Sequence, residues 1–362
     1  MSTDVTDLDQ GRVEPERSGG PLLDVRDLTV RFTRRGRPDV RAVDGVSFSV
    51  RPGQVVGLVG ESGSGKSVTS LAVMGLLPNR GVQVEGEVLF GGRDLLRASD
   101  RELSRMRGSD MAMVFQDPMT SLNPVVPVGT QVTEVLRTHT DLDRSSAREE
   151  AEDLLRRVGI PDPRRRLTEY PHQLSGGMRQ RAMIAIALAC KPRLLIADEP
   201  TTALDVTIQA QVLELLKQLV KDTGTAMIMI THDLGVVAGL CDEVNVMYAG
   251  RVVENASRTE LFGVPRHRYT EGLLASIPRL DQPRGEKLRP IPGTPRDTVP
   301  WSVKCAFAPR CAHEVEGCSE PGLALRPDPQ RPGHQVRCAN PADVAQAAPH
   351  PDAVPTPRKD LR

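Results

Sequence analysis

The sequence lacks the features that define several large classes of protein. Its 47 basic and 47 acidic side chains cancel, so there is no overall field to attract nucleic acid or an anionic membrane surface. No run of ~18 apolar residues occurs, and we expect no transmembrane helix. Residues 1–20 are polar and acidic, unlike a secretory leader. We therefore expect a cytosolic protein that reaches a membrane only through partners.

Cysteine is also scarce, and six cysteines in a cytosolic chain favour buried thiols or a metal site over disulfides. Cys190 and Cys241 lie in apolar helical surroundings and are predicted core residues. The other four have the spacing C-x5-C-x6-C-x19-C, which lacks the C-x2-C pairs of common zinc modules: Cys305, Cys311, Cys318 and Cys338. Their proline-rich flap has few apolar residues, so we expect a metal to hold together what packing cannot. Four free thiols are the alternative.

A glycine-rich loop carries the first strong functional signal. It follows an apolar run at 54–59, precedes a helix expected from Ser67, and matches the phosphate-loop pattern Gly-x-x-x-x-Gly-Lys-Ser/Thr. Its backbone N–H groups and the helix N-terminus would cage phosphate. Lys66 would reach the β- and γ-phosphates, and Ser67 would bind Mg²⁺. The predicted nucleotide-binding residues are Gly60, Glu61, Ser62, Gly63, Ser64, Gly65, Lys66, Ser67 and Val68. An accidental Gly/Ser-rich loop is the alternative.

Alternating apolar runs and helical patterns predict an α/β fold with a mostly parallel sheet covered on both faces. The expected strands are 23–32, 43–50, 54–59, 84–90, 111–115, 194–197, 226–230 and 243–248. The expected helices include 67–77, 179–190 and 206–222. A helical insertion is expected at about 117–180, where Ser146 and Glu149 have capping-box spacing and Gly159 would end a helix.

Two carboxylates follow the apolar strand at 194–197, in the form of a Walker B motif. Ligands bind at the carboxyl edge of a parallel sheet. Asp198 would hold Mg²⁺, usually through water, and Glu199 would orient and deprotonate the attacking water. Two solvated acids at a capped strand end are the alternative.

The run Leu174-Ser175-Gly176-Gly177-Met178 resembles the signature loop of ABC transporter ATP-binding subunits. A serine and two glycines at a helix start make a second anion site. The resemblance implies that two such domains pair head to tail. Ser175, Gly176 and Gly177 of one domain would then cover the γ-phosphate held by the phosphate loop of the other.

The remaining elements of that family fall in the expected order. Gln116 is similar to the Q-loop residue, which contacts Mg²⁺ or water and couples the site to a transmembrane partner. Residues 202–205 are similar to the D-loop, which places Asp205 near nucleotide, and His232 matches the switch histidine that contacts the γ-phosphate. A lone histidine after a strand could also be purely structural.

One position departs from the family pattern. Family members usually stack an aromatic side chain on adenine from a loop about twenty residues before the phosphate loop. Val40 and Arg41 are the nearest candidates here, and Phe32 is the only aromatic residue in reach. Adenine packing is therefore the part of the site that the sequence defines least.

The runs 115–124, 170–173, 197–207 and 291–295, with the cysteine segment, look like the dipeptide and oligopeptide importer branch. The resemblance covers about residues 22–340. It implies a P-loop NTPase fold with a RecA-like parallel sheet, antiparallel N-terminal strands, a helical subdomain and a small irregular Cys/Pro-rich C-terminal segment. It also implies that the four cysteines hold a 4Fe–4S cluster; zinc is the alternative, with His313 or His334 able to replace a ligand.

The expected organisation is a disordered tail at 1–21, a nucleotide-binding domain at 22–256, a C-terminal region at 257–340 and a second disordered tail at 341–362. The resemblance implies an ATPase on the cytoplasmic membrane face. Its partners would be two permease subunits, a second ATPase subunit, more often different than identical, and indirectly an extracytoplasmic peptide-binding protein. An ATPase for nickel or another solute, or an ABC ATPase outside transport, such as one in DNA repair, remains an alternative. No nucleic acid partner is expected.

Overall fold

The computed structural model describes residues 20–34, 36–117, 121–202, 204–277, 290–295, 301–321 and 323–342. Most of the two predicted tails, 1–19 and 343–362, and most of the proline-rich stretch between 278 and 300 lie outside these ranges. No helix in the described ranges is both long and apolar enough to cross a membrane.

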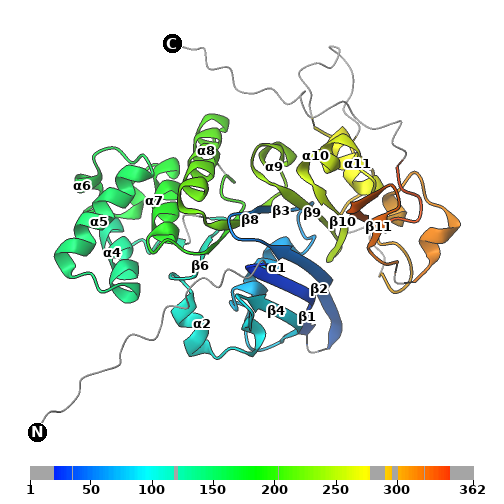
Figure 1. Ribbon diagram of the computed structural model, residues 1–362, viewed down its shortest axis with the longest axis horizontal. Helices are drawn as coiled ribbons and strands as arrows, with labels where there is room; N and C mark the ends of the chain where they lie inside the picture. Colours follow the sequence, from blue (N-terminus) through cyan, green and yellow to red (C-terminus); the bar gives the residue numbers. More distant parts are fainter. Residues whose placement is uncertain are drawn as a thin grey trace, which may run out of the picture.

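A mixed sheet runs through the centre of the molecule (Figure 1). Its strand order is β11-β12-β10-β9-β3-β8-β7-β6, and the run from β9 to β6 is parallel. The parallel strands β3, β7 and β8 are buried along their whole length, as expected when both faces are covered. The predicted α/β fold with a parallel core is thus confirmed. The strands are β3 (Val55–Val59), β6 (Met111–Val114), β7 (Leu194–Asp198), β8 (Ala226–Thr231), β9 (Glu243–Tyr248), β10 (Arg251–Ser257), β11 (Arg326–Asp328) and β12 (Arg331–Val336).

A second, antiparallel sheet of order β2-β1-β4-β5 lies beside helix α1 (Figure 1). Its strands are β1 (Leu23–Arg34), β2 (Arg37–Val50), β4 (Val82–Phe90) and β5 (Arg93–Asp94). Helix α1 (Lys66–Val73) contacts both sheets, and one apolar core joins Leu23 and Leu28 of β1 to Leu58 of β3. The helix ends before the predicted Leu77 because Gly75 takes a left-handed conformation, φ 60°. The next elements are η1 (Leu95–Arg97) and α2 (Asp100–Met106).

Helices between β6 and β7 gather on one side of the molecule (Figure 1). They are α4 (Val128–His139), α5 (Arg144–Arg157), α6 (Pro163–Arg166), η2 (Pro171–Gln173) and α7 (Gly176–Leu188). The predicted capping box at Ser146 is wrong: Asp143 caps α5, and its carboxylate accepts the Ser146 N–H at 2.7 Å. Gly159 follows α5 at φ 72°, as the sequence predicted. Helices α8 (Val206–Thr223) and α9 (Leu234–Leu240) come later in the chain.

The C-terminal region is more regular than predicted. It contains α10 (Arg258–Gly263), α11 (Arg268–Ala275), η3 (Ala308–Arg310) and η4 (Glu316–Ser319), and β12 extends the central sheet by pairing with β10. Trp301, Ala306 and Phe307 are buried in the same core as the helical insertion and the parallel strands. The expectation that packing cannot hold this flap is therefore wrong, because a few large apolar side chains pack it into the shared core.

Candidate functional site

The phosphate loop connects β3 to α1, as the sequence predicted. Gly60 has φ 152°, and a Cβ there would lie 2.2 Å from the Met247 carbonyl oxygen. Gly65 has φ 104°, and a Cβ would lie 2.6 Å from the Ala42 carbonyl oxygen. Both positions require glycine because L side chains rarely adopt this backbone and no space exists for a Cβ. The backbone of this loop therefore requires glycine at these two positions of the pattern.

Lys66 is buried over this loop. Its Nζ donates to the carbonyl oxygens of Gly60 at 2.7 Å and Glu61 at 3.0 Å, and to Ser64 Oγ at 3.4 Å. Burial lowers the pKa of Lys66, and the nearby carboxylates of Glu199, Asp198 and Glu61 oppose that shift. Anionic phosphate oxygens are stronger acceptors than neutral carbonyls. Lys66 can therefore transfer its donors to a phosphate bound in the loop.

Ser67 and Asp198, the two residues predicted to bind Mg²⁺, lie within hydrogen-bonding distance of each other. The Ser67 hydroxyl donates to Asp198 Oδ1 at 3.0 Å, across the gap between α1 and the end of β7. Burial raises the pKa of Asp198, the hydrogen bond from Ser67 lowers it, and the Glu199 charge raises it further. A hydroxyl and a carboxylate are hard oxygen donors, so this pair fits Mg²⁺.

Glu199 follows Asp198 in a left-handed conformation, φ 45°. A non-glycine residue held at positive φ stores backbone strain, which is common at functional sites. The Glu199 carboxylate accepts hydrogen bonds from Gln116 Nε2 at 3.0 Å and Thr202 Oγ1 at 2.9 Å, and lies 3.3 Å from His232 Nδ1. The structure thus brings Gln116, Glu199 and His232 together from three separate segments.

In the signature loop, Ser175 and Gly176 are exposed and Gly177 is half-buried. Ser175 caps α7 by accepting the Met178 N–H at 3.3 Å, and Asp205 caps α8 by accepting the Ile208 N–H at 3.0 Å. Gly177 packs closely on α8, since a Cβ there would lie 2.8 Å from Ile208 Cγ2. Across the described part of the chain, no hydrogen bond joins residues 175–177 to the phosphate loop.

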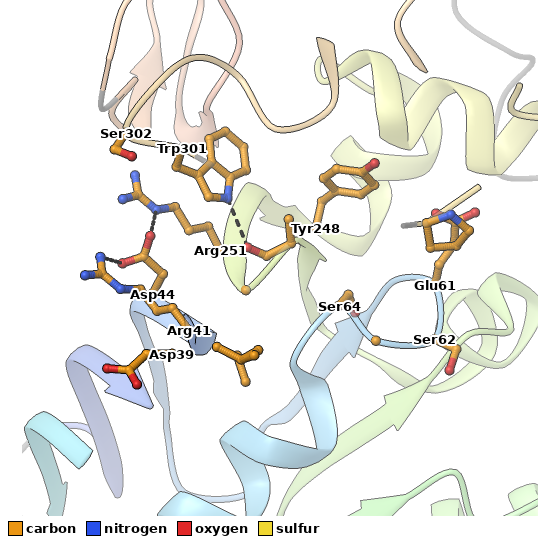
Figure 2. A pocket seen from close by; sticks show the side chains of 16 residues that line it. Asp39, Arg41, Asp44, Glu61, Ser62, Ser64, Tyr248, Arg251, Trp301 and Ser302 are labelled. Atoms are coloured by element: carbon orange, nitrogen blue, oxygen red, sulfur yellow. Dashed lines mark hydrogen bonds and ion pairs between the residues drawn. The ribbon is translucent and has the colours of Figure 1, made fainter. Parts of the chain in front are cut away.

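A cavity of about 630 Å³ opens beside the phosphate loop. Figure 2 shows Trp301 and Arg251 on one side of it and the loop with Ser62 and Ser64 on the other. Trp301 is 5% exposed, and its indole N–H donates to the Ala249 carbonyl oxygen at 3.0 Å. Further lining residues are Asp39, Val40, Arg41, Asp44, Tyr248 and Pro295.

Val40 and Arg41, the nearest sequence candidates for packing on adenine, both line this cavity. The sequence did not point to Trp301, the only tryptophan in the chain, which the C-terminal region contributes to the cavity. A lone tryptophan so far along the chain from the phosphate loop carries no motif. The one available signal was its place in the segment that resembles the importer branch.

Two of the four C-terminal cysteines, Cys305 and Cys318, are buried, and Cys311 and Cys338 are partly exposed. Burial raises the pKa of Cys305 to about 11 and of Cys338 to about 12, and neighbouring thiols of the same set add to both shifts. In the ranges that the structure describes, no three His, Cys, Asp or Glu side chains are grouped to hold a metal ion. Cys241 is buried, as predicted for a core residue.

Comparison with protein families and relatives agrees with this site. Residues 43–202 match the ABC transporter family, and residues 253–318 match the oligopeptide/dipeptide transporter C-terminal region. The dipeptide transport ATP-binding protein DppD of Bacillus subtilis is 51% identical over 88% of this chain and 94% of its own. The oligopeptide transport ATP-binding protein OppD of Escherichia coli is 50% identical over 84% of this chain and 89% of its own.

Solved structures of ATP-binding cassettes are similar to this chain. A dimeric ATP-binding cassette, MJ0796, bound to ADP and phosphate in a post-hydrolysis state, superposes with a TM-score of 0.59 at 27% identity, over 65% of this chain and 98% of its own. The fold and the site are thus those of an ABC-type ATP hydrolase. This chain belongs to the family of dipeptide and oligopeptide ABC transporter ATP-binding proteins.

Proposed function

We propose that this protein is the ATP-hydrolysing subunit that powers import of dipeptides or oligopeptides through separate transmembrane subunits. The observation that carries the proposal is the convergence of Lys66, the Ser67–Asp198 pair and the Gln116–Glu199–His232 group at one edge of the parallel sheet. The C-terminal region that the chain shares with peptide transporter relatives supports a peptide cargo.

The residues divide the reaction among them. The phosphate loop binds the α- and β-phosphates through its N–H groups, with Val68 at the start of α1, and Lys66 binds the β- and γ-phosphates. Mg²⁺, held by Ser67 and Asp198 and approached by Gln116, supplies charge neutralisation of the phosphates when bound. Glu199 accepts a proton from the attacking water, and His232 orients Glu199 and contacts the γ-phosphate.

The exposed signature loop supports a head-to-tail dimer in which Ser175, Gly176, Gly177 and Asp205 face the nucleotide of a second ATPase subunit. We favour a different subunit over a second copy. The further partners would be two permease subunits and, indirectly, an extracytoplasmic peptide-binding protein, and they would hold this chain at the cytoplasmic membrane face. Within the chain we assign the nucleotide-binding domain to 22–256, with a helical subdomain at about 117–180, and the importer-type C-terminal region with the four cysteines to 257–340.

We also propose that Cys305, Cys311, Cys318 and Cys338 hold a 4Fe–4S cluster, with zinc as the alternative. Their mutual influence on pKa indicates one electrostatic neighbourhood, and the His313 N–H donates to Cys311 Sγ at 3.4 Å, a contact that favours thiolate. The support for a metal is the chemistry of four thiol donors, since the structure does not group these side chains around a common point. Visible absorbance, together with iron and zinc analysis of anaerobically purified protein, distinguishes a 4Fe–4S cluster from zinc. Protein that contains neither iron nor zinc would refute both assignments.

Purification of the complex from membranes tests the transport role. The copurified permease subunits and second ATPase should be identified by mass spectrometry, and ATP turnover of the reconstituted complex should rise with a di- or oligopeptide and its binding protein. Nickel or other small solutes serve as control cargo. Turnover that responds to nickel and not to peptide would refute the peptide assignment and leave the ATPase assignment intact.

A further inference from the structure

An ion pair links the second residue of the phosphate loop to the cysteine segment. Arg310 Nη1 lies 2.6 Å from Glu61 Oε2, and Arg310 Nη2 lies 3.0 Å from Glu61 Oε1. The guanidinium therefore forms a bidentate ion pair with the carboxylate through two parallel hydrogen bonds, the strongest and most directional form of this pairing. Arg310 immediately precedes Cys311 in the sequence, although 249 residues separate it from Glu61.

Arg310 is itself fixed from several sides. Its side chain is 2% exposed, its Nε donates to the Pro292 carbonyl oxygen at 2.9 Å, and its guanidinium lies about 6 Å from the ring centres of Tyr248 and Phe307. The Glu61 carboxylate is 25% exposed, so the pair is largely shielded from water. Such shielding makes the pair more costly to break than a surface salt bridge.

The same segment of the loop has a second anchor in the C-terminal region. The Glu61 N–H donates to the hydroxyl of Tyr269 in α11 at 2.8 Å, and Tyr269 is fully buried. The Glu61 carbonyl oxygen in turn accepts from Lys66 Nζ. Arg310 and Tyr269 thus fix both the side chain and the backbone of a residue that positions the phosphate-binding lysine.

We propose that Arg310 is a positioning residue for nucleotide binding: through Glu61 it holds the phosphate loop in the shape that accepts phosphate. The cysteine segment is then a structural part of the ATP site and not only an appended flap. This inference rests on the assignment of residues 60–67 as the ATP-binding loop. It predicts an effect on nucleotide affinity and KM, with kcat retained, because Glu199 and His232 do not touch the pair.

The test is a double-substitution cycle on the full-length protein, read out by the Kd of a fluorescent ATP analogue with Mg²⁺ and by KM and kcat. Arg310→Gln and Glu61→Gln should each weaken binding roughly three- to thirtyfold, the range for residues coupled in one network. The double variant should lose no more than either single one. Arg310→Lys should show an intermediate loss, because an ammonium keeps the charge but not the two-pronged geometry.

Arg266→Gln is the matched control. Arg266 forms a similarly buried ion pair with Asp328 in the same region, but that pair does not touch the phosphate loop. We expect this variant to lower the unfolding temperature and leave the Kd unchanged.

Wild-type affinity in Arg310→Gln, or losses that multiply in the double variant, would overturn the inference. If Arg310→Gln does not fold, the Kd of Glu61→Gln, compared with that of the control Arg266→Gln, still tests whether the ion pair supports nucleotide binding. Unchanged affinity in Glu61→Gln would overturn the inference. Wild-type protein that does not bind Mg-ATP would overturn the ATP site itself and this inference with it.

Discussion

Replacing Glu199 by glutamine tests the catalytic group most directly. Glutamine has the same shape and can still accept hydrogen bonds from Gln116 or Thr202, which now lie 3.0 and 2.9 Å from the carboxylate. It cannot take a proton from water. Removing a general base typically costs about 10²- to 10⁴-fold in rate, which corresponds to roughly 3–5 kcal/mol in the barrier.

Nucleotide binding should survive, because the amide leaves Lys66 and the Ser67–Asp198 pair in place. Phosphate release should therefore fall by that factor while the Kd for Mg-ATP stays within about twofold. Gel filtration of the variant together with its partner ATPase subunit should show an ATP-bound dimer that persists. Thr202→Val is the matched control: it removes one donor to Glu199 but keeps the base, and we expect a loss of about tenfold or less. Turnover close to wild type in Glu199→Gln would refute the assignment of the base.

Three further predictions concern other parts of the protein. Ser175→Gly should lower ATP turnover by roughly 10²- to 10³-fold through loss of a phosphate donor, while glycine at the cap of α7 costs only a few tenths of a kcal/mol; unchanged turnover at a normal unfolding temperature would contradict a catalytic signature loop. Val40 is 48% exposed at the cavity, so Val40→Tyr should strengthen ATP binding by about threefold to tenfold through base stacking, measured against Val40→Leu; equal affinities would place adenine elsewhere. Burial lowers the pKa of His267 from 6.5 to about 4. Between these pH values the unfolded chain binds a proton that the folded chain does not, so the free energy of unfolding should fall by about 3 kcal/mol as the pH falls from 6.5 towards 4. Urea unfolding at pH 7 and pH 4.5 checks this, and His267→Asn, which can still cap α11, should lose that part of the pH dependence; an identical pH dependence in both proteins would show that His267 is not buried in neutral form.

The sequence by itself predicted the candidate nucleotide site. The glycines at 60 and 65, the apolar run at 194–197 and the carboxylates that follow it are local patterns, and each fixes its own backbone and chemistry. Because the carboxyl ends of parallel strands meet at one sheet edge, the order of these motifs also implied that Asp198 would face Ser67, as it does at 3.0 Å. The sequence predicted helix boundaries less accurately than the site residues. The Ser146–Glu149 spacing fitted a capping box, but Asp143, three residues before Ser146, caps the helix.

Only the tertiary structure decided what the C-terminal region contributes. Its proline-rich sequence has no periodicity to place it, yet β12 joins the central sheet, Trp301 lines the cavity and Arg310 grips Glu61. The Arg310–Glu61 pair joins residues 249 positions apart, and no local propensity specifies which distant carboxylate a buried arginine will meet. The contacts of the C-terminal region depend on a core that forms only when this region and the nucleotide-binding domain pack together. The sequence therefore indicated the phosphate loop but not Arg310, which contacts it through Glu61.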